Sequence, residues 1–191
     1  MTPTPVSAPG AHIAQLAAQH APAYKMLRDE ALRSAPEAFT SDYATALGQP
    51  AESYVRRLSM PASEGFFLGA FDAAGQLLGS IGCLREERLQ QRHMASVVAM
   101  MVAPKAQRQG IGQLLLHACI ARADGIAGLE QLILTVTASN MHVVRLYENA
   151  GFRPYGLLPR AIVVAGTGYD KLHMVRLLAA APAPPQAARC P

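Results

Sequence analysis

The residues from Val97 to Asp124 (VVAMMVAPKAQRQGIGQLLLHACIARAD) have the types and spacing needed to hold an anion. An apolar run leads into a short loop that contains Gln107, Gly110 and Gly112, and an amphipathic run follows the loop. A turn at a helix N-terminus presents several backbone N–H groups together with about half a positive charge from the helix dipole. Glycine allows close approach because it has no Cβ. The segment therefore predicts an anion site at the start of a helix.

Two other phosphate-binding motifs do not fit these residues. A P-loop needs a Lys-Ser or Lys-Thr pair, and none follows Gly110. A dinucleotide-binding fingerprint needs a third glycine at the position of Leu115. A bare Gly-x-Gly is also consistent with an ordinary strand–helix turn, so the interpretation depends on the surrounding residues and on a second motif downstream.

That second motif is LTVTASNMHVVRLYENAGFRPYG, which begins at residue 134. A β-rich run ends at Ser139 and Asn140, two residue types that favour the N-cap of a helix. Val143, Leu146, Tyr147 and Ala150 then recur at helical spacing, which predicts one apolar face. Gly151 suits the left-handed position after the helix, and Phe152 is expected to fold back on the last turn. Asn140 and Tyr147 should share a face about two turns apart.

Taken together, the two segments resemble the GNAT superfamily of N-acetyltransferases. Gln107, Gly110 and Gly112 stand at the fixed positions of its coenzyme A motif, Gln/Arg-x-x-Gly-x-Gly/Ala. The second segment is similar to the one that carries a cofactor-contacting Asn and a Tyr beside the cofactor sulfur, here Asn140 and Tyr147. The C-terminal GTGYDKLHMVRLL, read with PEAFTSDY, is similar to a bacterial group of unassigned acceptor.

This resemblance implies acetyl-CoA as cosubstrate, no metal, and transfer of the acetyl group to a primary amine by direct attack in a ternary complex. The strand before the loop would be splayed by a bulge, with the backbone N–H groups of Met100, Met101 and Val102 facing the pantetheine and the carbonyl. Met101 would make the oxyanion contact and Tyr147 would be the general acid. The implied cofactor-binding residues are Met101, Val102, Gln107, Arg108, Gln109, Gly110, Ile111, Gly112, Gln113, Asn140, Val143 and Tyr147.

The general base is where the sequence departs from the family pattern. Ser96 stands where many GNAT enzymes carry a catalytic Glu, and a serine cannot act as a base at neutral pH. Glu86, Glu87 and His93 are the nearby titratable groups, and each is also consistent with an ordinary surface residue. His93 has a side chain in the right pKa range for the task. A water-mediated route and an amine that arrives neutral both stay open.

The order of predicted elements is α/β (α+β) and agrees with a GNAT fold across residues 12–178. We expect a mixed, mostly antiparallel central sheet of six to seven strands, flanked by about four helices and splayed at the cofactor-binding strand. The strand at 93–103 is nearly continuously apolar, which predicts burial on both faces. The other predicted strands are 12–17, 64–71, 77–84, 131–137, 152–158 and 169–178, and the predicted helices are 21–34, 51–58, 110–124 and 139–150. Residues 1–11 and 179–191 are expected to be disordered tails.

Composition indicates one soluble, cytoplasmic domain. Of 191 residues, 51% are hydrophobic, yet no apolar run reaches the roughly 20 residues of a membrane helix. The N-terminus lacks the layout of a secretory signal. The odd number of cysteines predicts reduced thiols, with Cys83 and Cys119 in the core and Cys190 in the tail. The net charge of +4 is spread along the chain, which argues against nucleic acid.

Several functional alternatives remain open at this point. The acceptor is either a small amine or a protein N-terminus or lysine, and its site should be built from residues 24–60 and the hairpin 153–173. A non-catalytic acyl-CoA-binding sensor with the same fold is the other class, because the usual Glu is absent at Ser96. No membrane partner is expected, and a homodimer is left open.

Overall fold

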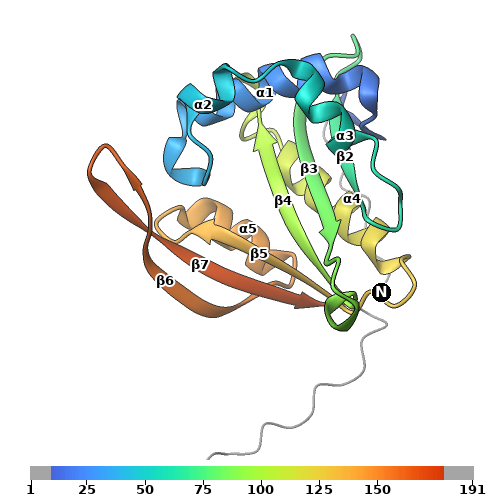
Figure 1. Ribbon diagram of the computed structural model, residues 1–191, viewed down its shortest axis with the longest axis vertical. Coiled ribbons are helices and arrows are strands. Elements are labelled where there is room, and N and C mark those ends of the chain that lie inside the picture. The colour runs from blue at the N-terminus through green and yellow to red at the C-terminus, as the bar shows by residue number, and fades with distance from the viewer. Residues whose placement is uncertain (1–9, 179–191) are drawn as a thin grey trace, which may run out of the picture.

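The computed structural model describes residues 10–178, and the predicted tails lie outside them except for Gly10 and Ala11. This part of the chain contains one seven-stranded sheet in the order β1-β2-β3-β4-β5-β7-β6, together with five α-helices (Figure 1). Neighbouring strands are antiparallel except β4 and β5, which run parallel. The mixed, mostly antiparallel sheet predicted from the sequence is thus confirmed. None of the helices between residues 10 and 178 has the length and apolarity needed to cross a membrane.

Most element boundaries fall within two residues of the predicted ones. The strands are β1 (His12–Gln15), β2 (Gly65–Phe71), β3 (Leu77–Arg85), β4 (Met94–Val102), β5 (Gln131–Thr137), β6 (Arg153–Val164) and β7 (Thr167–Leu177). The helices are α1 (Ala21–Ser34), α2 (Tyr43–Leu47), α3 (Val55–Leu58), α4 (Ile111–Asp124) and α5 (Met141–Asn149). The last two strands are longer than predicted and meet at a tight turn at Ala165 and Gly166.

The segment between α1 and β2 differs most from prediction. The helix expected over 51–58 is a 3₁₀ turn at Ala51–Tyr54 that continues into the single α-turn of α3. Helix α2 was not predicted; it begins where the Asp42 carboxylate accepts the Thr45 N–H at 2.8 Å. Helices this short carry too few apolar repeats for periodicity to indicate them.

Burial of β4 also differs from prediction. Its residues alternate between buried and half-buried, whereas the apolar run predicted burial on both faces. Met101 and Val97 are buried, but Val98, Ala99 and Met100 retain exposed surface because they line a cavity. The apolar composition therefore belongs to a strand that lines a cavity rather than to a fully covered one.

The helices lie on two faces of the sheet. Phe67 of β2 makes an edge contact with Tyr24 of α1, with ring centroids 6.0 Å apart. Gly82 of β3 pairs with Phe67, so it faces α1, and the next residue, Cys83, faces the other way. Cys83 hydrogen-bonds Cys119 of α4, and this bond and burial raise the pKa of the Cys119 thiol. Both cysteines are buried, as predicted, and α1 and α4 cover opposite faces.

Candidate active site

Strands β4 and β5 diverge soon after they begin (Figure 1). They pair only from Met94 to Ser96 on β4 and from Gln131 to Ile133 on β5. Beyond Ser96, β4 stays with β3 and β5 stays with β7. One edge of the β4 backbone is thereby left without a partner strand. The opening lies at the carboxyl ends of two parallel strands, where open sheets usually bind ligands.

A β-bulge sits on β4 where this edge is free. The β3–β4 register shifts between Ser80 and Gly82, and Ala99 has a positive φ of 50°. The buried Ser80 hydroxyl donates to the Ala99 carbonyl at 3.1 Å, so that carbonyl points toward β3. In a trans peptide the following N–H points the opposite way. The Met100 N–H therefore faces the opening between β4 and β5.

The ladder beyond the bulge places the next donors. Ala103 N–H donates to the Leu78 carbonyl of β3 at 2.8 Å. Because hydrogen-bonded pairs alternate in an antiparallel ladder, the Met101 N–H also points toward β3 and the Val102 N–H points away from it. The Met101 side chain is buried. Met100 and Val102 thus present their backbone donors to the opening, whereas Met101 does not.

The loop between β4 and α4 is built as the sequence predicts for an anion site. Gly110 is the N-cap of α4 and has a φ of 79°, a left-handed conformation that glycine adopts without strain. Among the described residues, no backbone carbonyl accepts from the N–H groups of residues 108–113. The Gln107 side chain donates to the Val102 carbonyl at 3.2 Å and ties the loop to β4. A row of free N–H groups thus coincides with the positive end of a 14-residue helix.

Helix α5 closes the other side of the opening. Asn140 caps the helix, with its side-chain oxygen accepting the Val143 N–H at 3.3 Å. Tyr147 is almost fully buried, and its hydroxyl donates to the thioether sulfur of Met100 at 3.2 Å. Phe152 packs against the Tyr147 ring, with centroids 5.8 Å apart, as predicted. Burial raises the pKa of Tyr147, and the nearby Cys119 adds to the shift.

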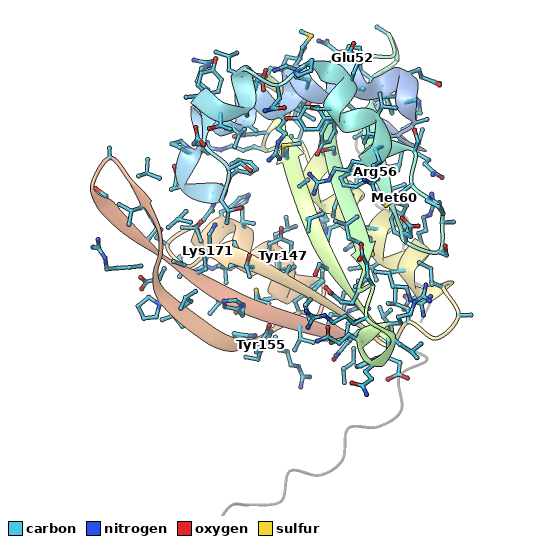
Figure 2. The ribbon with its side chains drawn as sticks, in the orientation of Figure 1. Glu52, Arg56, Met60, Tyr147, Tyr155 and Lys171 are labelled. Carbon is cyan, nitrogen blue, oxygen red and sulfur yellow. The ribbon has the colours of Figure 1, made fainter. Side chains whose placement is uncertain are left out.

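These elements enclose a cavity of about 340 Å³. Met100, Asn140, Val143 and Tyr147 line it on the side of β4 and α5. The opposite wall comes from α1, the segment 38–41 and α3, and Lys171 of β7 closes one end (Figure 2). The cavity therefore joins the predicted cofactor residues to the early helices that were expected to hold the acceptor.

The acetyltransferase (GNAT) family matches residues 24–152, from α1 through Phe152. The chain belongs to this family. The match covers the first motif and the second as far as Phe152, and it ends just before β6, so β6 and β7 lie outside it. The family assignment and the expected fold are thereby confirmed, and the chain carries an acyltransferase domain.

Relatives and solved structures agree with this assignment. A mycothiol acetyltransferase of Salinispora tropica is 38% identical over 86 residues, which are 45% of this chain and 28% of that protein. The chain thus spans little more than a quarter of this relative. A GNAT acetyltransferase from Streptococcus pneumoniae has a TM-score of 0.79 at 23% identity and covers 88% of this chain and 99% of its own.

Two further structures extend the comparison. A GCN5-related N-acetyltransferase from Kribbella flavida has a TM-score of 0.74 at 28% identity, covering 90% of this chain and 100% of its own. A phosphinothricin acetyltransferase from Sinorhizobium meliloti, in complex with acetyl-CoA, has a TM-score of 0.77 at 19% identity. The match covers 88% of this chain and 89% of that chain.

Lys171 is a site residue of this GNAT chain that the sequence did not indicate. Its ammonium group is buried and donates to the Ala38 carbonyl and the Thr137 hydroxyl, both at 2.9 Å, and to the Glu37 carbonyl at 3.4 Å. The Thr137 hydroxyl in turn donates to the Glu37 carbonyl at 2.7 Å. Burial lowers the pKa of Lys171, and the Glu37 charge opposes this shift. Lys171 therefore fastens the 36–38 turn to β5 and β7 at the edge of the cavity.

The base candidates lie away from the cavity wall. The Ser96 hydroxyl donates to the Glu86 carboxylate at 3.0 Å, so a carboxylate stands beside the position where many relatives carry Glu. Glu87 is exposed, and His93 precedes β4 at the end where β4 and β5 are still paired. None of Ser96, Glu86, Glu87 and His93 is among the residues that line the cavity.

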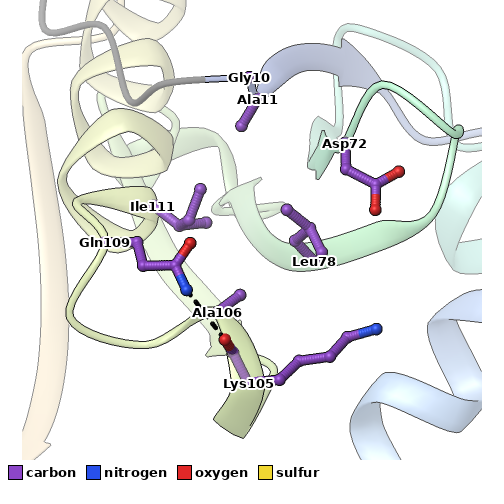
Figure 3. Close-up of a pocket in the computed structure, with 8 residues that line it drawn as sticks. All are labelled: Gly10, Ala11, Asp72, Leu78, Lys105, Ala106, Gln109 and Ile111. Atoms are coloured by element: carbon purple, nitrogen blue, oxygen red, sulfur yellow. Dashed lines mark hydrogen bonds between the residues drawn. The ribbon is translucent and has the colours of Figure 1, made fainter.

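A second cavity of about 260 Å³ lies on the outer side of the α4 loop (Figure 3). Gly10, Asp72, Lys105 and Gln109 are among its lining residues, and the Gln109 side chain donates to the Lys105 carbonyl at 2.9 Å. Of the residues predicted to contact the cofactor, Gln109 and Ile111 line this cavity. Neither Tyr147 nor any residue of β4 lines it, whereas Tyr147 and Met100 both line the larger cavity.

Proposed function

We propose that this protein is an acetyl-CoA-dependent N-acetyltransferase that transfers the acetyl group directly to an amine in a ternary complex. The observation that carries the proposal is the convergence of the Met100 N–H and the Tyr147 hydroxyl at one side of the cavity. In acyl transfer from a thioester, a fixed N–H donor can stabilise the developing oxyanion, and a hydroxyl can donate to the leaving sulfur. Acetyl-CoA supplies that thioester when bound.

The residues present fit this cosubstrate. The free N–H groups of residues 108–113 would hold the pyrophosphate, and the Asn140 side chain and the Val102 N–H would orient the pantetheine. Gly112 faces Met100, and a Cβ at Gly112 would lie 3.2 Å from the Met100 methyl carbon. A side chain there would narrow the path from the loop to the cavity.

We assign the oxyanion contact to the Met100 N–H in preference to Met101, because the ladder turns the Met101 N–H toward β3. Tyr147 stays protonated because burial raises its pKa. It would act chiefly as a hydrogen-bond donor to the leaving sulfur, since a hydroxyl with a raised pKa is a poor source of a full proton. Its present bond to the Met100 sulfur has the same donor–acceptor chemistry.

Proton removal from the amine is assigned to Glu86, acting through Ser96 or through water. Among the candidates, Glu86 has a carboxylate held at position 96, whereas Glu87 and His93 have no such contact to that position in the described structure. The cavity adds a second effect. Arg28, Arg57 and Lys171 line it without any acidic side chain, and nearby positive charge favours the neutral form of an amine.

The proposal is tested by measuring free thiol released from acetyl-CoA with a panel of small amines and N-terminal or lysine-containing peptides. Acceptor-dependent release above the hydrolytic background is expected, with small amines ahead of peptides because the cavity is small for a binding site. Calorimetry of acetyl-CoA binding accompanies the assay. Binding without acceptor-dependent release would favour the acyl-CoA sensor instead.

A further inference from the structure

The cavity wall formed by the early helices carries two arginines, Arg28 of α1 and Arg57 of α3. Lys171 also lines the cavity, and no Asp or Glu side chain is among its lining residues. The three acceptors of Lys171 are protein atoms, so its donors are occupied. Arg28 and Arg57, called here the arginine pair, differ from Lys171 because their donors are not all occupied by protein atoms.

The arginine pair has unused hydrogen-bonding capacity. Arg28 donates to the Ser41 hydroxyl at 2.9 Å, and the Arg57 guanidinium carbon lies 5.1 Å from the centroid of the Phe67 ring. Within residues 10–178, neither guanidinium lies within the 4.0 Å of a carboxylate oxygen that defines an ion pair. Each guanidinium has five N–H donors and is always charged. Most of these donors are therefore free for a ligand.

Tyr24 lies close to the arginine pair, although it is not among the residues that line the cavity. It lies one helical turn before Arg28 and is fully buried. Burial raises the pKa of Tyr24, and the charges of Arg57 and Arg28, together with a hydrogen-bonding contribution from the Arg28 side chain, oppose that rise, so both guanidinium groups lie near this hydroxyl.

The arginine pair lies on the acceptor side of the sheet, away from the cofactor phosphates. Phe67 contacts both Tyr24 and Arg57, which places this cluster on the α1 face. The row of free N–H groups at residues 108–113 belongs to the start of α4, which covers the opposite face. The positive charge of the arginine pair therefore serves a ligand other than the pyrophosphate of coenzyme A.

We propose that Arg28 and Arg57 bind an oxyanion group of the acceptor, so that the preferred substrate is a small amine that also carries a carboxylate, phosphinate or phosphonate. This rests on the acetyltransferase function proposed above. Guanidinium groups form short, charge-assisted and often bidentate hydrogen bonds with such groups. With the oxyanion at the arginine pair, the amine end would point toward Met100 and Tyr147, which line the same cavity from β4 and α5.

The same charges select against other acceptors. A polyamine would bring additional positive charge beside two guanidinium groups, and like charges at a binding site exclude such ligands. An amine without an oxyanion group would leave the arginine pair desolvated without a partner, which also costs binding energy. The cavity volume of about 340 Å³ lies at the lower end of the roughly 300–1,000 Å³ of small-molecule sites, so the acceptor should be small.

The first experiment compares matched acceptors with the wild-type protein. Methionine is compared with methioninamide and with 3-(methylthio)propylamine, and 2-aminoethylphosphonate is compared with ethanolamine. Spermidine represents the polyamines. We expect kcat/KM to be at least about tenfold higher for the acceptor with the oxyanion in at least one matched set. The two sets distinguish a carboxylate from a phosphonate. Equal or higher kcat/KM for the acceptors without an oxyanion group, including spermidine, would overturn the proposal.

The second experiment uses Arg28→Gln and Arg57→Gln, with Arg33→Gln and Arg56→Gln as controls. Both control positions are exposed and do not line the cavity. For the preferred oxyanion-bearing acceptor, each test variant should lose about 10- to 100-fold in kcat/KM, the loss expected for a hydrogen-bonded contact to a charged group. The uncharged acceptor of the same set should change less than about threefold. A variant that loses both equally, or neither, contradicts the proposal.

Calorimetry of acetyl-CoA separates this inference from the function on which it rests. All four variants should bind acetyl-CoA with wild-type affinity. If wild-type protein binds acetyl-CoA but releases no thiol with any acceptor, the transferase function fails. If thiol is released and the charge of the acceptor makes no difference, only the arginine inference fails. Arg57→Lys, which retains the charge, should recover part of the selectivity even if Arg57→Gln folds poorly.

Discussion

Replacing Tyr147 by Phe removes one hydroxyl and keeps the ring in its packed position. In the structure this hydroxyl donates to the Met100 sulfur and faces the cavity. Donation to a sulfur that becomes negatively charged is worth about 1.5–3 kcal/mol, the range for hydrogen bonds to charged groups. That range corresponds to a loss of roughly 10- to 150-fold in rate at about 1.4 kcal/mol per tenfold.

A larger effect is not expected, because Tyr147 is a weak acid in this position. Even an ordinary tyrosine, with a pKa near 10, protonates a thiolate of pKa about 8.5 uphill by about 2 kcal/mol. Burial raises the pKa of Tyr147 further and makes full proton transfer less favourable still. The loss should therefore stay well below the upper part of the range for general acids, about 10⁴-fold.

Stability should hardly change in Tyr147→Phe. The only partner of the hydroxyl within the described structure is a thioether, a weak acceptor, so the change should be below about 1 kcal/mol. For a chain of this size, that is within about 4 °C in melting temperature. Tyr155→Phe is the matched control, because Tyr155 is 60% exposed on β6 and lies outside the cavity (Figure 2).

The assay combines single-turnover rates, acetyl-CoA calorimetry and thermal melts on both variants. A wild-type rate in Tyr147→Phe would refute the role assigned to the hydroxyl. A parallel loss of acetyl-CoA affinity would reassign it to ground-state binding.

The same variant tests the pKa of Tyr147 itself. The unfolded chain ionises this tyrosine near pH 10, while the folded protein keeps the proton because burial raises the pKa. Above about pH 10 the unfolded state then binds fewer protons, so the free energy of unfolding falls as pH rises. Tyr147→Phe should lose less stability than wild type between about pH 10 and 11. An identical alkaline decline in the two proteins would contradict the raised pKa.

Three further predictions concern the walls of the cavity and the loop. Gly110→Asp should weaken acetyl-CoA binding about 30-fold or more by placing a like charge at the N–H row, whereas Gly166→Asp, at a turn glycine with a similar φ of 82°, should leave calorimetric affinity unchanged. Asn140→Asp keeps the cap but not the amide, so KM for acetyl-CoA should rise more than kcat falls at unchanged melting temperature; Asn140→Ala should also lose about 1 kcal/mol. Lys171→Met should destabilise the fold by about 1–3 kcal/mol because it leaves the half-buried Ala38 carbonyl without its Lys171 donor, and an equal melting shift in the exposed control Lys105→Met would refute this.

Local sequence patterns were sufficient to predict the elements that are expected to hold the cofactor. The α4 loop, the Asn140 cap and the Tyr147 face each depend on residues within one or two helical turns, and such patterns can be read along the chain. Helix α1 was predicted with its observed boundaries for the same reason.

The cavity wall that includes α1, α3 and Lys171 could not be predicted, because its contacts join residues that are distant in the chain. Lys171 and Ala38 are 133 residues apart, and Thr137 meets Lys171 only because β5 and β7 pair in a register that places them opposite each other. Arg28 and Arg57 carry no local signal that separates them from ordinary surface arginines. Their common cavity depends on how α1 and α3 pack, which no local pattern specifies.

The bulge at Ala99 depends both on the local sequence of β4 and on a contact with β3. The run VVAMMV contains no glycine, so nothing local indicates a left-handed residue within it, and a non-glycine residue in that conformation costs on the order of 1 kcal/mol. The Ser80 hydrogen bond offsets much of this cost. The extra residue also reverses which face each later side chain occupies. It turns Met100 toward Gly112 and Tyr147 and leaves Met101 on the α1 face. A regular strand would reverse these positions and remove the contact between Tyr147 and Met100. The strain at Ala99 is therefore the structural condition for the proposed chemistry.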